Sequence, residues 1–143
     1  MTTTMLRWRD QLELNPFGTM SALAAVILGS LGILRGDGIS AGMTNSLTTA
    51  GTAAIIAHLW GAMFAAGGAM KLYGLYRHKP SVEIPGLWLM TAGFAFYSLT
   101  VTAGLGFHGL AAGIVSGTTA AGCLLKVRLI MRRARAAQRR GDR

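Results

Sequence analysis

Acidic residues are scarce in this sequence, and charge of either sign is unevenly spread. Five Asp and Glu residues stand against fourteen Lys and Arg residues, and charged residues make up only 13% of the chain. A soluble domain usually carries about 25% charged residues, spread over its surface. Between residues 38 and 70 there is no Lys, Arg, Asp or Glu at all. This composition argues against a water-soluble fold and favours a membrane protein, in which charges gather in loops and tails.

Cysteine is almost absent, which excludes one kind of covalent framework. The single residue, Cys123, cannot form an internal disulfide, and the chain has no Cys and His cluster typical of a metal site. We expect Cys123 to be a small packed residue, with lipidation as the alternative because it lies near a helix end. The few carboxylates are scattered, whereas an enzyme needs polar groups that converge. The sequence therefore predicts a non-enzyme without cofactor or metal.

Long apolar runs dominate the rest of the chain. A helix needs about 20 residues to cross a hydrocarbon core of ~30 Å. The runs show no alternation typical of strands, and open strands in lipid would leave backbone groups unpaired. The sequence therefore predicts an all-α integral membrane bundle of four transmembrane helices, with a cytoplasmic segment at 1–16 and a basic tail at 132–143. The four predicted spans are residues 17–34, 49–70, 84–105 and 109–131.

The ends of the spans carry the expected residues. Pro16 and Pro85 suit a first helical turn, and Gly36 can end the first helix. An alternative for the first run is a signal peptide cleaved after Ala41. The long preceding segment, with its Asp and Glu residues, disfavours cleavage.

The distribution of Lys and Arg predicts the orientation. With both termini in the cytoplasm, thirteen basic residues lie inside and one, Arg35, lies outside. Three or five spans would place the basic N-terminal segment and the basic tail on opposite sides. Since cytoplasmic loops carry the excess of positive charge, we expect a multi-pass protein of a bacterial inner membrane with both termini cytoplasmic.

Small residues recur every four positions in two of the predicted spans. Such stripes let helix backbones approach closely in lipid. The contacts they predict lie within one chain or between copies, so a homo-oligomer and a protein partner in the membrane are both expected. The candidate packing residues are Ala53, Ala57, Gly61 and Ala65 in the second span and Gly109, Gly113, Gly117 and Ala121 in the fourth.

His58 is the ionisable residue predicted to lie deep in a span. An ionisable group at that depth is a candidate pore-lining or proton-sensitive residue. The competing interpretation is a neutral imidazole hydrogen-bonded to a neighbouring helix, which the lack of an intramembrane carboxylate favours.

The basic tail predicts contact with anionic lipid headgroups. Each basic residue near such a surface contributes roughly 1 kcal/mol, and the helix is expected to continue into the tail along the membrane surface. A nucleic-acid partner is disfavoured because the rest of the chain is too apolar for a soluble binder. The candidate headgroup residues are Lys126, Arg128, Arg132, Arg133 and Arg135.

The stretch LYGLYRHKPSVEIPGLWLMTAGFAFYSLTV, followed by a Gly- and Ala-rich span and a basic tail, resembles small four-span holin-like membrane proteins of actinobacterial phages. The resemblance is one of layout over Leu59 to Arg140, and no site residue is carried over from it. It implies accumulation in the host inner membrane, self-association and the opening of a hole. The alternatives are an accessory subunit that packs against a larger partner, and a small transporter or channel.

Overall fold

The computed structural model describes residues 15–36, 45 and 50–141, with side chains described over 15–36, 45 and 54–139. The elements of this part of the chain are helices: α2 (Pro16–Arg35), α4 (Ala50–Arg77), α5 (Pro80–Leu105), the short 3-10 helix η2 (Gly106–Gly109) and α6 (Leu110–Gly141). The predicted all-α architecture is confirmed.

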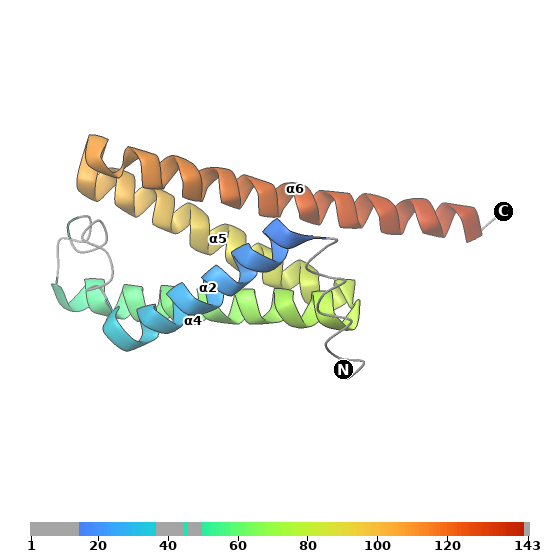
Figure 1. Cartoon of the computed structure of the whole chain (residues 1–143), viewed down its shortest axis with the longest axis horizontal. Helices are drawn as coiled ribbons and strands as arrows, with labels where there is room; N and C mark the ends of the chain where they lie inside the picture. Colours follow the sequence, from blue (N-terminus) through green and yellow to red (C-terminus); the bar gives the residue numbers. More distant parts are fainter. Residues whose placement is uncertain (1–14, 37–44, 46–49, 142–143) are drawn as a thin grey trace.

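Three described stretches are long and apolar enough to cross a membrane: Pro16–Arg35, Ala54–Arg77 and Pro80–Arg139. The third includes α5, η2 and α6, and the chain reverses direction at η2 (Figure 1). Gly106 lies at φ 53°, a left-handed conformation that glycine adopts at little cost. This reversal lays α6 back along α5.

The helices pack in an open series rather than a closed ring. α2 packs on α4, α4 on α5, and α5 on α6 (Figure 1). The start of α2 and the α4–α5 turn lie towards one end of the molecule. The end of α2, the start of α4 and η2 lie at the opposite end. Each outer helix, α2 and α6, therefore leaves a broad apolar face uncovered by the other described helices.

The predicted ends of the first helix are confirmed by its capping groups. Pro16 is its first residue, and the Asn15 side chain accepts a hydrogen bond from the Gly18 N–H at 3.2 Å. An N-cap acceptor of this kind satisfies one of the unpaired amides of the first turn. At the other end Gly36, at φ 58°, donates its N–H to the Gly32 carbonyl.

The stretch between the second and third predicted spans, residues 71–83, is not an open loop, because helices cover nearly all of it. α4 runs to Arg77 and α5 begins at Pro80, with Pro85 inside the helix rather than at its start. His78, at φ 52°, and Lys79 make the turn, and the Lys79 N–H donates to the Gly74 carbonyl at 2.9 Å. Lys71 and Glu83 are buried in these helices, whereas Arg77 and Lys79 at the turn are exposed.

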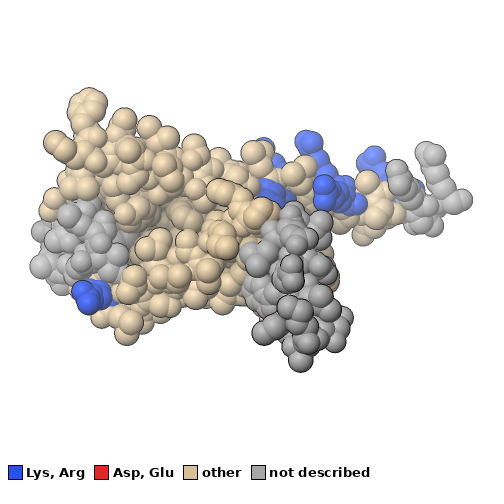
Figure 2. Space-filling model, viewed as in Figure 1, with Lys and Arg blue, Asp and Glu red and all other residues tan. Residues whose placement is uncertain are grey.

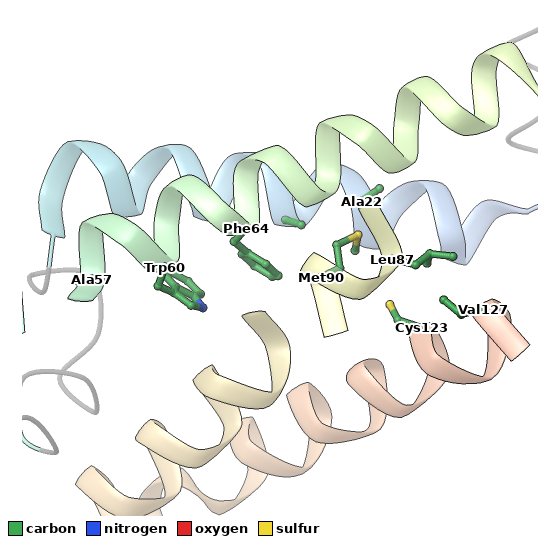
Figure 3. Packing of buried hydrophobic residues seen from close by; sticks show 9 residues of the cluster. Ala22, Ala57, Trp60, Phe64, Leu87, Met90, Cys123 and Val127 are labelled. Carbon is green, nitrogen blue, oxygen red and sulfur yellow. The ribbon is translucent and has the colours of Figure 1, made fainter. Parts of the chain in front are cut away.

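The core changes character along its length. Between α2 and α4 the core is made of small residues, with Ala25 and Ala57 fully buried. Between α4 and α5 the core is aromatic, with the Trp60 ring stacked 5.1 Å from Phe64. Figure 3 shows Cys123 and Val127 of α6 pointing toward Leu87 of α5.

α6 is far longer than a single crossing requires. Its 32 residues extend for about 48 Å at 1.5 Å per residue, and its C-terminal turns project beyond the other helices (Figure 1). The helix therefore continues through the predicted tail as far as Gly141. The alternative cleavage site after Ala41 and the side chain of Ala53 lie outside the described residues.

Candidate functional site

The small residues of α4 pack against α2 of the same chain. A Cβ placed on Gly61 would lie 2.8 Å from the carbonyl oxygen of Gly29 and 2.8 Å from the carbonyl carbon of Gly32. Ala57 is fully buried beside them, whereas Ala65 is half-buried. The matching stripe on α2 runs through Ala22, Ala25, Gly29 and Gly32. Its irregular spacing of three and four residues hides it from a search at four-residue intervals.

The small residues of α6 pack against α5. A Cβ on Gly113 would contact Thr102 Oγ1, and Ser98 Oγ donates a hydrogen bond to the Gly113 carbonyl at 2.7 Å. Gly109 and Gly117 also face α5. Ala121, by contrast, is exposed, and the buried face continues through Ala120, Cys123 and Val127. A helix turns by 100° per residue, so a strict four-residue stripe drifts off a straight contact.

His58 lies near the end of α2, away from the end of the bundle that holds the α4–α5 turn. Its imidazole lies 3.2 Å from where a Cβ on Gly36 would be, and the residue is exposed. It is the ninth residue of α4, so it sits towards the start of this helix. Its role as a proton-sensitive residue stays a prediction.

The polar groups of the bundle meet at the opposite end, around Lys71. This residue of α4 is only 2% exposed. Its ammonium donates a hydrogen bond to Ser21 Oγ of α2 at 3.0 Å, while the Ser21 hydroxyl donates to the Gly18 carbonyl. Within the described part of the chain, no carboxylate lies within ion-pair distance of the Lys71 ammonium. A buried charge without an ion-pair partner is costly. Lys71 is therefore the centre of the candidate site.

An ion pair closes the cluster between α5 and α6. Lys126 Nζ lies 2.7 Å from Glu83 Oε1, with the side chains 28% and 11% exposed. Gly74 of α4 lets α4 and α5 approach closely at Glu83, because a Cβ there would lie 2.7 Å from the Glu83 nitrogen. The described cluster thus holds two ammonium groups for one carboxylate, drawn from three helices.

A cavity of about 120 Å³ lies beside these groups. Its walls come from all four long helices and include Ser21, Lys71, Thr119, Cys123 and Lys126. Gly122 also lines it, and a Cβ on this glycine would meet nothing within 4 Å. The cavity is therefore polar on one wall and open on the side of Gly122.

The predicted headgroup residues divide into two groups. Lys126 is half-buried in its ion pair, whereas the four arginines are exposed on the surface of α6: Arg128, Arg132, Arg133 and Arg135. On the face seen in Figure 2, basic side chains gather along the C-terminal half of α6. The exposed arginines are thus free to meet a lipid surface, while Lys126 serves the cluster.

Lys71 and Glu83 were not among the sequence-based candidates. Their pattern, a basic residue and an acidic residue flanking His78 and Pro80, is typical of a loop. The available signal was the short turn between two long helices, which lays them side by side, with Lys71 opposite Gly86 and Glu83 opposite Gly74. Among the described residues, no group of three His, Cys, Asp or Glu side chains is placed to hold a metal ion.

Comparison of the chain with known protein families, with curated proteins and with solved structures finds no match.

Proposed function

We propose that this chain is a four-span membrane protein that self-associates in the host inner membrane and permeabilises it, as a holin does. The N-terminal segment and the basic tail would both lie in the cytoplasm. Anionic lipids would be its surface partners, through the exposed arginines of α6.

Helix length and chain reversal support the proposal of four crossings. α5 has 26 residues, about 39 Å, and α6 has 32, so each alone can span a core of ~30 Å. They run in opposite directions from η2 (Figure 1). With α2 and α4, the arrangement brings the start of α2, the α4–α5 turn and the end of α6 to one side, which is the side with the excess of Lys and Arg.

The open series of helices carries the proposal of self-association. Because α2 contacts α4 and α6 contacts α5, the described helices of one chain do not surround a passage across the bilayer. The polar cluster sits at one end, and the middle of the bundle is closed by Trp60, Phe64 and Met90. Any hole would therefore need several copies.

An apolar groove between α4 and α5 offers a place for a second copy. It holds about 380 Å³ and is lined by Leu59, Trp60, Met63, Ala92 and Phe96, together with Ile56. Since lipid tails are as apolar as these side chains, helices associate here by close packing. Bulky exposed side chains on α6, such as Ile114 and Val115, suit such a groove.

Inducible expression in a bacterium tests the proposal, with growth, membrane potential and cross-linking in the membrane followed together. We expect an abrupt collapse of the potential after a delay, preceded by cross-linked oligomers. Ala92→Leu fills the groove and should delay or abolish the collapse. Ala66→Leu is the matched control, because Ala66 is an exposed residue of α4 that does not line the groove.

Substitution of Gly113 and Gly117 is a poor probe of association, because a side chain there would enter the contact with α5. Steady growth with protein in the membrane would contradict the holin-like role and favour an accessory subunit. A flux that depends on an added solute would favour a small transporter.

A further inference from the structure

Within the described residues, the polar cluster around Lys71 carries more positive than negative charge. Two lysines share one described carboxylate, that of Glu83, which lies against Lys126. The N-terminus of α2 lies beside them and adds a further partial positive charge from the helix dipole. No acidic residue in the first turn of α2 offsets this charge. An anion placed between these groups would balance the charge.

The Lys71 ammonium also has unused hydrogen-bonding capacity. It carries three donors, and among the described residues Ser21 Oγ accepts one of them. The residue is only 2% exposed, so little of its side chain reaches bulk water. Its side chain lines the cavity, which places the unused donors at the edge of an open volume.

The cavity is large enough for a tetrahedral oxyanion. About 10–15 Å³ on the same measure holds one water molecule, and this cavity offers about 120 Å³. Thr119 and Asn15 add polar atoms to its walls, while Leu87 and Phe17 add apolar surface. Phe17 is 72% exposed, so the cavity has both a charged floor and an apolar rim.

We propose that this cavity binds a phosphate group through Lys71 and Lys126, beside the N-terminus of α2. The phosphate comes either from an anionic phospholipid headgroup, with its acyl chains along the exposed apolar side chains of α2, or from free phosphate. The site is independent of hole formation, and it differs from the surface contacts of the tail because the anion is held among buried groups.

Native mass spectrometry of the full-length protein in detergent tests the proposal with three probes: phosphatidylglycerol, phosphatidylcholine and inorganic phosphate. We expect one tightly held phosphatidylglycerol per chain. Gly122→Leu projects a side chain into open space at the cavity wall and should weaken this binding at least about tenfold. Ala121→Leu, at the neighbouring exposed position outside the cavity, should leave it unchanged.

The charge requirement is tested by Lys71→Gln, with thermal unfolding as a check on folding. The double variant Arg132→Gln/Arg133→Gln separates the cavity from the tail, because both arginines are exposed. It should reduce general binding to anionic vesicles and leave the single tight lipid in place.

The outcomes distinguish the sources of the anion. Retention of phosphatidylglycerol that inorganic phosphate cannot displace assigns the site to lipid. Retention of inorganic phosphate by the protein, or displacement of phosphatidylglycerol by inorganic phosphate, assigns the site to free phosphate. Equal binding by wild type and Gly122→Leu, loss of the tight lipid in the arginine variant only, or no binding of any probe would overturn the proposal.

Discussion

The indole nitrogen of Trp60 donates a buried hydrogen bond to the carbonyl oxygen of Gly93, at 2.9 Å, and so joins α4 to α5. The ring also stacks on Phe64 and lies 5.9 Å from Tyr97. Gly93 is the partner because its Cα carries no side chain: a Cβ there would contact the Phe64 ring. One residue thus combines a polar and an aromatic contact where the two helices cross.

Trp60→Phe should destabilise the protein by about 0.5–2 kcal/mol, because it removes the donor and leaves the Gly93 carbonyl without this partner. The measurement is thermal unfolding in detergent. Trp88→Phe is the matched control, since Trp88 is 50% exposed, and we expect a change within about 0.5 kcal/mol. Equal effects of the two substitutions would show that the hydrogen bond contributes nothing.

Gly61→Ala and Gly122→Ala should change stability in opposite directions. A Cβ on Gly61 would lie 2.8 Å from backbone atoms of α2, so α2 must move, at a cost of about 1–3 kcal/mol. A Cβ on Gly122 meets nothing within 4 Å, so alanine there should stabilise the helix by up to about 1 kcal/mol. Thermal unfolding of both variants, measured side by side, tests these opposite changes in stability. A more stable Gly61→Ala variant would contradict the α2–α4 contact.

Glu83→Gln should destabilise the basic end by about 1–3 kcal/mol, because two ammonium groups then share no described carboxylate. The partial exposure of Lys126 keeps the expected loss below that of a fully buried pair. The double variant Glu83→Gln/Lys126→Gln should lose less than the sum of the two single variants. A double-mutant cycle measures this coupling, and strict additivity would argue against the ion pair.

The proposed orientation is tested by reporter fusions. A reporter after Arg143 should be active in the cytoplasm, and one inserted near Ser40 should be active on the other side of the membrane, because thirteen of the fourteen basic residues then lie inside. Two reporters with opposite compartment requirements serve as controls for each other. Activity of both fusions in the same compartment would exclude three crossings between Ser40 and Arg143.

Much of the helical framework was predictable, since it depends on local chemistry. The first helix begins at Pro16 and ends before Gly36 as expected, because proline fits a first turn and glycine adopts the left-handed conformation of the cap. The reversal at Gly106 follows from the same rule. The predicted start of α5 is wrong because Pro80 and Pro85 both suit a first helical turn. Only the packing of the helices decides that α5 begins at Pro80.

The candidate site was less predictable, because it depends on residues brought together from four helices. Lys71 and Glu83 look like loop residues until α4 and α5 are seen to continue past them. Cys123 and Lys126, in turn, face the cluster only because α6 lies along α5.

By itself the sequence determined an all-helical, membrane-type chain with its basic residues gathered at the N-terminal segment, the middle turn and the tail. Apolar length and charge distribution are properties of the chain alone, so no tertiary contact was needed to establish them. Only the tertiary structure decided which small residues meet within the chain and which, like Ala121 and Gly122, stay open. It also decided that Lys71 is buried beside a cavity, because burial depends on where neighbouring helices cross and not on the residue's own position in the sequence.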